Sequence, residues 1–128
     1  MSAASEKSEL RNRYRFERRE RYLDHSFSYL ATSTEFAKVS NIASYISYAD
    51  EPSTKELNAA LLKSGKTLYL PRISGEKLEW FKWSGDSKDL APSKFSKKIF
   101  EPVGPAISDK SIIELVIVPA LRIDRSGY

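Results

Sequence analysis

The 128-residue sequence has no cysteine, 41% hydrophobic residues, 12% aromatic residues and a formal net charge of +4. The length favours a single domain over residues 1–128, and the composition is typical of a globular rather than a disordered protein. The lack of cysteine excludes disulfides, thiolate nucleophiles and Cys-ligated zinc. No apolar run reaches the roughly 20 residues of a membrane span, so we expect a cytoplasmic protein without membrane contact.

The basic excess is concentrated at the N-terminus. Residues 1–22 carry seven basic and four acidic side chains, so +3 of the net charge lies there. Residues 5–24 contain no proline or glycine and predict a helix, on which Lys7 and Arg11 lie one turn apart. Three interpretations stay open for this helix: a solvated surface with Glu–Arg pairs, a phosphate-binding wall, or a nucleic-acid-binding arm. The interspersed glutamates weigh against the third.

The next segments alternate between helical and extended patterns. Residues 26–38 predict a second helix, and residues 40–48 predict a first strand that ends before Pro52. Ser53 to Glu56 has the spacing of a capping box and begins another helix, which residues 67–71 follow as a second strand. Strand, helix and strand within about thirty residues form a βαβ unit with two parallel strands.

A third strand follows, and a long irregular segment comes after it. Residues 77–83 predict a more exposed strand, and we interpret its aromatic cluster of Trp80, Phe81 and Trp83 as core and sheet cover rather than a ligand platform. Residues 86–111 are interrupted by proline and glycine, which predicts loops.

The last stretch is the most apolar one. Residues 112–118 form an almost continuous aliphatic run closed by Pro119, which predicts a strand buried on both faces of a parallel sheet. The expected fold class is therefore α/β: a three-layer open sheet, mostly parallel, with flanking helices.

Most familiar catalytic patterns are missing. His25 is the only histidine and has no candidate base nearby, and no metal-binding spacing, dinucleotide fingerprint or P-loop occurs. Polar residues instead follow the expected parallel strands: Asp50 and Glu51 after the first, Arg72 after the second, Asp124 after the last. Open α/β sheets bind ligands at this edge, so a heterocycle, a phosphate and a divalent ion are candidate ligands. The alternative, that these are ordinary turn and cap residues, stays open.

Five short motifs, in order along nearly the whole chain, resemble those of the 5-formyltetrahydrofolate cyclo-ligase family, also called 5,10-methenyltetrahydrofolate synthetases. They are Lys7-Ser8-Glu9-Leu10-Arg11, Tyr45 through Glu51, Gly65 through Arg72, Glu101-Pro102, and Glu114 through Gly127. Each motif alone is weak, and their shared order and spacing carry the resemblance. It implies a sheet fold like that of sugar-phosphate isomerases and CoA transferases.

The resemblance implies an ATP-dependent reaction in which the formyl oxygen of 5-formyltetrahydrofolate attacks the γ-phosphate of Mg-ATP. N10 then closes the ring, and phosphate leaves to give 5,10-methenyltetrahydrofolate beside ADP. By position in the motifs, Lys7 and Arg11 would bind the ATP phosphates. Ile46 and Glu51 would bind the folate, Glu51 by accepting hydrogen bonds from the pterin, and Arg72 is a further substrate-binding candidate. ATP as co-substrate, Mg²⁺, and a monomer without nucleic-acid partners are implied as well.

The sequence also departs from the family pattern. Ala120 stands where the family has glycine, and Ile123 where it has phenylalanine. The family's glycine-rich phosphate stretch and its metal-holding aspartate would come after Gly127 and are not in this sequence. We therefore expect a cyclo-ligase-like domain that lacks the C-terminal glycine-rich loop and turns over little or no substrate by itself. A non-catalytic module whose basic helix binds RNA or an acidic partner is the alternative.

Overall fold

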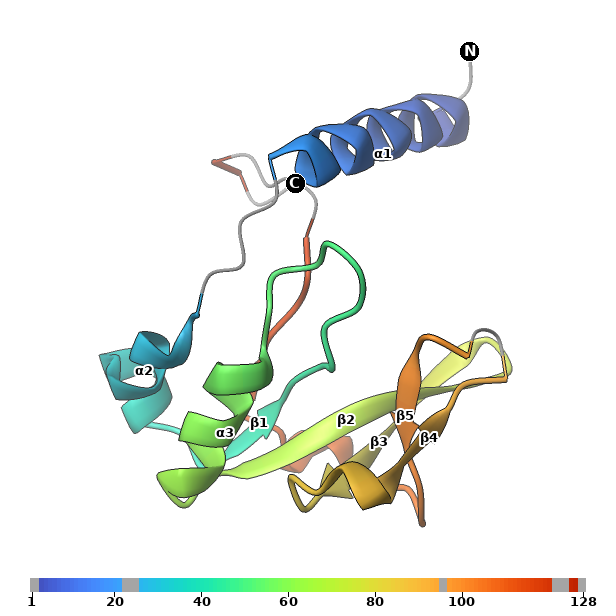
Figure 1. Cartoon of the computed structure of the whole chain (residues 1–128). Coiled ribbons are helices and arrows are strands. Elements are labelled where there is room, and N and C mark those ends of the chain that lie inside the picture. The colour runs from blue at the N-terminus through green and yellow to red at the C-terminus, as the bar shows by residue number, and fades with distance from the viewer. Residues whose placement is uncertain (1–2, 22–25, 95–96, 121–124, 127–128) are drawn as a thin grey trace.

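The computed structural model describes residues 3–21, 26–94, 97–120 and 125–126 of the chain (Figure 1). The helical elements are α1 (Ala3–Glu20), η1 (Ser28–Thr32), α2 (Thr34–Ala37), α3 (Lys55–Lys63), η2 (Ser87–Asp89) and η3 (Lys110–Ile112). The strands are β1 (Asn41–Ala43), β2 (Thr67–Ser74), β3 (Lys77–Trp83), β4 (Leu90–Pro92), β5 (Phe100–Pro102) and β6 (Leu115–Val116). Among the described residues, no helix is both long and apolar enough to cross a membrane.

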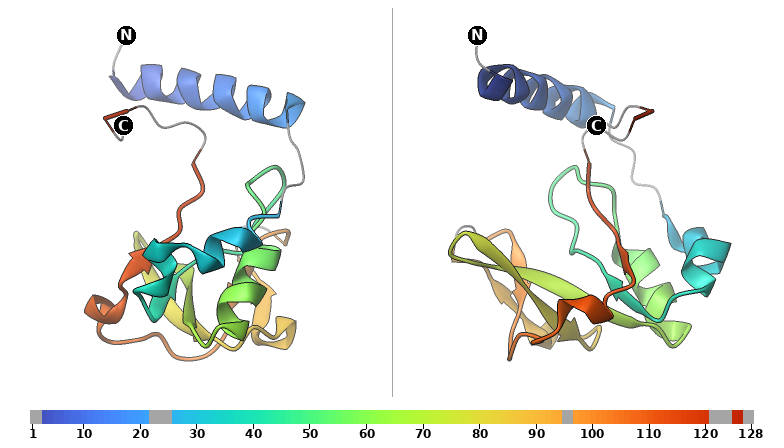
Figure 2. Two further views of the ribbon diagram at one scale, coloured as in Figure 1. Left: turned by 90° about the vertical axis from the view of Figure 1, so that its left-hand side faces the viewer. Right: turned by 180° about the vertical axis from the view of Figure 1, so that it is seen from behind.

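Four strands form the main sheet, in the order β3-β2-β1-β6. β1 pairs in parallel with both β2 and β6, and β3 pairs antiparallel with β2. The β4–β5 ribbon is antiparallel and lies against β2 and β3 (Figures 1 and 2). The predicted α/β class, with a mixed, mostly parallel sheet and flanking helices, is confirmed, as is the parallel β1-α3-β2 unit.

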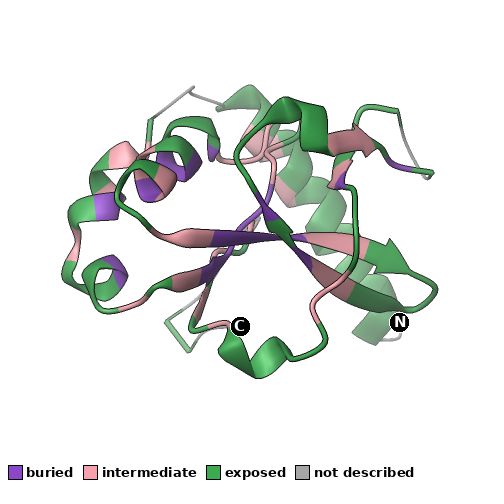
Figure 3. Cartoon of the chain, turned by 90° about the horizontal axis from the view of Figure 1, so that it is seen from below, coloured by how far each residue is buried: buried purple, intermediate pink, exposed green. Residues whose placement is uncertain are grey.

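The core lies between the sheet and the helices α2 and α3. Ile42, Leu61 and Leu68 have no exposed surface, and β1 and β2 place Ile42 and Leu68 side by side in register. Burial of each such side chain contributes about 1.5–3 kcal/mol to folding. Phe81 and Trp83 are buried, which confirms the core prediction for two of the three aromatics of β3, whereas Trp80 is half-buried. Figure 3 shows that the buried residues concentrate at the centre of the sheet and on the inner sides of the helices.

The prediction for the C-terminal strand is wrong. β6 is two residues long, and Val116 is 51% exposed rather than buried on both faces. The reason is its position: in the sheet formed by the described residues, β6 is the edge strand and pairs with β1 alone. Residues 86–111, predicted as loops, contain the β4–β5 ribbon.

Three local predictions are also corrected. The second helix is interrupted at Ser33, whose backbone is extended, so η1 and α2 replace one helix over residues 26–38. The first strand ends at Ala43. The capping box does not form, because Thr54 is the N-cap residue of α3 and makes no side-chain capping bond.

α1 is the longest helix among the described residues, yet none of its residues is buried. Figures 1 and 2 show it lying apart from the sheet, next to the loop that connects β1 to α3. That loop contacts both α1 and the sheet, so it is the structural centre of the candidate site.

Candidate functional site

The base of the β1–α3 loop is fixed by buried hydrogen bonds. Ser44 Oγ donates to Asn58 Oδ1 over 2.6 Å, and Asn58 Nδ2 donates to the Tyr45 carbonyl over 3.1 Å. Thr54 Oγ1, instead of capping its helix, donates to the same carbonyl over 2.6 Å. Because buried polar groups are costly when unpaired, this satisfied network holds the start and the end of the loop on α3.

The tip of the loop is a tight turn that orients Glu51. The Glu51 N–H donates to the Tyr48 carbonyl over 3.1 Å, and Glu51 Oε1 accepts from the Tyr48 N–H over 2.8 Å. Ala49 inside the turn has φ of 53°, a left-handed conformation that costs a non-glycine residue about 1–2 kcal/mol. Such strain is concentrated at functional sites. The turn commits Oε1, and in the described structure Oε2 has no hydrogen-bond partner.

Beneath this turn lies a cleft of about 240 Å³, called here the apolar cleft. Its lining residues are Tyr45, Ile46, Tyr48, Glu51, Leu70, Pro71, Ile73, Leu78, Ile99, Phe100 and Glu101. Of the twelve exposed large hydrophobic residues among those described, five gather here: Tyr48, Ile73, Leu78, Ile99 and Phe100. An apolar cleft with a few polar groups is the usual form of a small-molecule site.

Tyr45 belongs to the wall of the apolar cleft and is also part of the loop. Its hydroxyl donates to the Pro52 carbonyl over 2.7 Å. Burial raises the pKa of Tyr45 to about 12, and the nearby negative charge of Glu51 adds to the rise. Tyr45 therefore stays neutral at physiological pH and acts as a structural donor rather than as a base.

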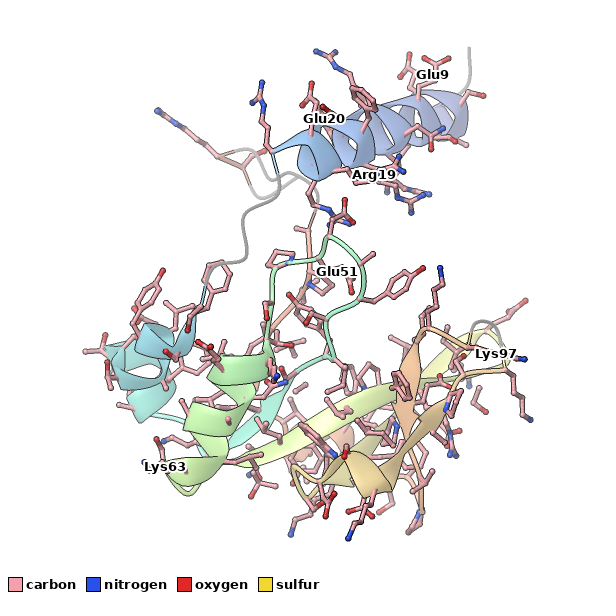
Figure 4. The ribbon with its side chains drawn as sticks, viewed as in Figure 1. Glu9, Arg19, Glu20, Glu51, Lys63 and Lys97 are labelled. Carbon is pink, nitrogen blue, oxygen red and sulfur yellow. The ribbon has the colours of Figure 1, made fainter. Side chains whose placement is uncertain are left out.

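A second cleft, of about 650 Å³, lies between α1 and the turn and is called here the basic cleft. It is lined by Asn12, Arg15, Arg18, Arg19, Tyr48, Ala49, Asp50 and Glu51. Figure 4 shows Arg19 on the side of α1 that faces the rest of the chain, whereas Glu9 and Glu20 project from the opposite side. The basic cleft shares Tyr48 and Glu51 with the apolar cleft, so the two adjoin at Glu51.

One ion pair joins α1 to the turn. Arg18 Nη2 lies 3.0 Å from Asp50 Oδ1, and the two side chains are 21% and 16% exposed. The Arg18 hydrogen bond lowers the pKa of Asp50 below its ordinary value, so the carboxylate stays ionised at neutral pH. Arg18 Nε and Asp50 Oδ2 are buried without a hydrogen-bond partner, which leaves one donor and one acceptor of this pair unused.

A third cleft, of about 480 Å³, is called here the side cleft and is lined by Arg72, Ile73, Ser74, Gly75, Lys94 and Glu101. Arg72 lies inside β2 and not after it, because β2 continues to Ser74 in register with β3.

Pro71 does not end β2, because this position needs no backbone hydrogen bond. The Ile73 N–H faces away from β3 and donates to Glu101 Oε2 over 3.3 Å. Pro71, two residues earlier, faces the same edge, where β1 has already ended and no ladder bond is lost.

The structure thus brings some of the predicted site residues together and separates others. Ile46 and Glu51 line the apolar cleft, and Arg72 lies in the adjoining side cleft. Lys7 and Arg11 are exposed on α1 and line none of these three clefts. His25 and Asp124 lie outside the described residues.

Sequence reasoning missed the arginines of the basic cleft, although their spacing contains a usable signal. Lys7, Arg11, Arg15 and Arg18 recur every three to four residues, so they form one stripe along α1. The predicted pair is therefore the N-terminal part of the same stripe whose C-terminal part borders the cleft. The contribution of Phe100 had no local signal, because it comes from a segment predicted as a loop.

The described residues do not form a metal centre. No group of three His, Cys, Asp or Glu side chains within them could hold a metal ion. Asp50, one of the two carboxylates lining the basic cleft, is engaged by Arg18. Mg²⁺ requires oxygen ligands and commonly takes several of them from a nucleotide. The described residues alone do not provide a full group of such ligands.

Comparison with known proteins identifies one family that matches the sequence and a solved structure that matches the fold. The profile of the 5-formyltetrahydrofolate cyclo-ligase family matches residues 3–128. No curated protein matches the sequence. The fold is similar to the NMR structure of Aquifex aeolicus 5,10-methenyltetrahydrofolate synthetase, with a TM-score of 0.75 and 26% identity over 95% of this chain. The chain spans 64% of the length of that protein. It therefore belongs to the 5-formyltetrahydrofolate cyclo-ligase family.

Proposed function

We propose that this chain supplies the folate pocket and one wall of the nucleotide site for the conversion of 5-formyltetrahydrofolate to 5,10-methenyltetrahydrofolate, with ATP consumed to ADP and phosphate. The observation that carries the proposal is the position of Glu51, which lines an apolar cleft on one side and an arginine-rich cleft on the other. The reaction needs such an arrangement, because a flat heterocycle and a polyphosphate must meet at one point.

The apolar cleft suits the folate ring system. Ile46 and Phe100 offer apolar surface to a flat ring, and both line the same cleft as Glu51. Glu51 Oε2 can accept hydrogen bonds from the N–H groups of a pterin, because Oε1 is already committed to the turn. The carboxylate would thus fix the orientation of the ring while the apolar walls supply most of the contact.

The basic cleft suits the phosphates of ATP. Arg15 and Arg19 are exposed and line the basic cleft but not the apolar cleft. Guanidinium groups bind phosphate oxygens in pairs and neutralise the charge that builds up during transfer. Lys7 and Arg11 would extend this wall along the same stripe toward the outer phosphates or the rest of the nucleotide.

The proposed chemistry is a phosphoryl transfer followed by ring closure. The formyl oxygen attacks the γ-phosphorus and ADP leaves. N10 then adds to the activated carbon and releases its proton to solvent, and the formyl oxygen departs as inorganic phosphate. Positioning and charge neutralisation are the main requirements, and no covalent protein nucleophile is needed. Mg²⁺ would enter with the phosphates of ATP, which supply several of its oxygen ligands.

Titration calorimetry with 5-formyltetrahydrofolate tests the folate half of the proposal. Replacement of Glu51 by glutamine removes a charged acceptor, which is worth about 1.5–3 kcal/mol or roughly 10- to 100-fold in Kd. Lys63→Gln is the control, because Lys63 is exposed at the far end of α3 (Figure 4). Failure of the unmodified chain to bind the folate, or equal affinity of the Glu51→Gln variant, would contradict the proposal.

The nucleotide half is tested by ATP binding to charge-removing variants. Arg15→Gln and Arg19→Gln should each weaken ATP binding by roughly 3- to 30-fold and leave folate affinity unchanged. Lys7→Gln and Arg11→Gln should also weaken it if the stripe acts as one wall. Unchanged ATP affinity in all four variants would contradict the phosphate-binding role and would mean that α1 is a solvated surface helix.

A further inference from the structure

We infer that the side cleft holds the carboxylates of the folate's glutamyl tail, with Arg72 and Lys94 as their partners. This inference rests on the proposed function, because it assigns the other end of the same ligand. It adds a role for Lys94, a residue outside every motif discussed so far, and it gives Arg72 a defined part of the substrate.

The first support is the continuity of the two clefts. The apolar cleft and the side cleft share Ile73 and Glu101 in their walls, so the two clefts adjoin and one extended ligand could occupy both. The chemical character changes along this path, from the carboxylate of Glu51 through exposed apolar side chains to two cations. A folate changes in the matching order, from pterin N–H groups through a benzoyl ring to carboxylates.

The second support is that the Arg72 guanidinium stacks on a buried ring. Its Cζ lies 4.0 Å from the ring centroid of Phe81, which is buried at 1% exposure. The stacked guanidinium is held in place by the core, and its planar edge can bind a carboxylate through two hydrogen bonds. Among the described residues neither Arg72 nor Lys94 forms an ion pair.

Glu101 is the acidic member of the side cleft, and its position is compatible with a bound carboxylate. Its Oε2 accepts from the Ile73 N–H over 3.3 Å, so this oxygen is engaged by β2. Two cations against one carboxylate leave the side cleft with a net positive charge at neutral pH. The middle of the path is apolar, since Leu78 and Phe100 are 46% exposed and line the adjoining cleft.

The test compares two ligands by calorimetry on the full chain. One is 5-formyltetrahydrofolate, and the other is a 5-formyltetrahydropterin that lacks the benzoylglutamate. Arg72→Gln should weaken folate binding by roughly 10-fold or more and Lys94→Gln by roughly 3-fold, because a stacked guanidinium is more ordered than an exposed ammonium. Neither variant should change affinity for the tail-less pterin, and Lys63→Gln should change neither.

The alternative outcomes can be distinguished. If the unmodified chain binds the pterin as tightly as the folate, or if both variants bind folate as tightly as the unmodified chain, the inference is overturned and the proposed function stands. An equal loss for both ligands in Arg72→Gln also overturns it, because Arg72 would then support only the Phe81 wall. Lys94→Gln keeps the test decisive if Arg72→Gln fails to fold, since Lys94 is exposed. Absence of binding for both ligands would overturn the proposed function together with the inference.

Discussion

The sheet and α1 contribute to the same site in different ways. The apolar cleft is built on the core: Leu70, in its wall, is 1% exposed and belongs to the main hydrophobic cluster. α1 has no buried residue, and the ion pair that joins it to the turn is Arg18–Asp50. Folding itself therefore forms the proposed pocket for the ring, whereas the proposed wall for the phosphates depends on electrostatic contact.

This difference has a functional consequence. Hydrophobic packing is not weakened by charge screening, whereas ion pairs near the surface are screened by salt and broken by protonation. The apolar cleft should therefore persist under conditions that release α1, and its affinity for folate should change less than the affinity for ATP.

The largest effect is expected from a core substitution matched with one on α1. Leu61 has no exposed surface, so Leu61→Ala should lower the free energy of unfolding by about 2–5 kcal/mol. Phe16 on α1 is 59% exposed, and Phe16→Ala should change it by less than about 0.5 kcal/mol. Urea unfolding followed by tryptophan fluorescence measures both. A large loss in Phe16→Ala would mean that α1 is packed more tightly than this structure shows.

The next effect concerns the base of the loop. Asn58→Ala removes a bond to Ser44 and one to the Tyr45 carbonyl, which should cost about 1–3 kcal/mol. Ser64→Ala is the control, because it deletes an exposed bond to the Ala60 carbonyl and should cost less than about 0.5 kcal/mol. If thermal unfolding shows the same loss of stability for Asn58→Ala and Ser64→Ala, the buried hydrogen-bond network does not hold the loop.

A smaller effect is expected for the Arg18–Asp50 contact. A double-mutant cycle of Arg18→Ala and Asp50→Ala should give a coupling free energy of about 0.5–1 kcal/mol at low salt. Hydrogen exchange of the α1 amides should accelerate in either single variant. The idea that this pair attaches α1 fails if exchange in α1 is the same in the single variants and the unmodified chain.

The smallest effect is the pH dependence of the same contact. Because the Arg18 hydrogen bond lowers the pKa of Asp50, its contribution is complete above the ordinary aspartate pKa of about 3.9 and is lost as pH falls through the lower folded value. Protection of the α1 amides should therefore fall on acidification below pH ~4. An Asp50→Asn chain should show no such step, and an identical step in it would assign the titration to another carboxylate.

Part of this arrangement could be predicted from the sequence. The parallel β1-α3-β2 unit was predictable because strand and helix periodicities differ and the turns are well marked. The strand after Lys110 was over-predicted, because an aliphatic run indicates burial without indicating which edge of the sheet is covered. The capping box failed since Thr54 has a better partner in the Tyr45 carbonyl, a contact that arises only in the folded chain.

The candidate site was also predicted only in part, because some of its residues come together only in the folded chain. Ile46 and Glu51 were identified from a motif, and they share a cleft in the folded chain. Arg15 and Arg19 were missed because local sequence does not reveal which turns of a basic helix face the body. Lys94 and Phe100 reach the clefts through the β4–β5 ribbon, whose pairing joins segments without a strong strand pattern.

The most direct test of the central claim, that one continuous path through Glu51 accepts both substrates, is amide chemical-shift mapping by NMR. Addition of 5-formyltetrahydrofolate should perturb Ile46, Glu51 and Phe100, and a later addition of ATP should perturb Arg15 and Arg19 with a second change at Glu51. Folate perturbations confined to surfaces away from Glu51, such as the exposed end of α3 around Lys63, would contradict the account.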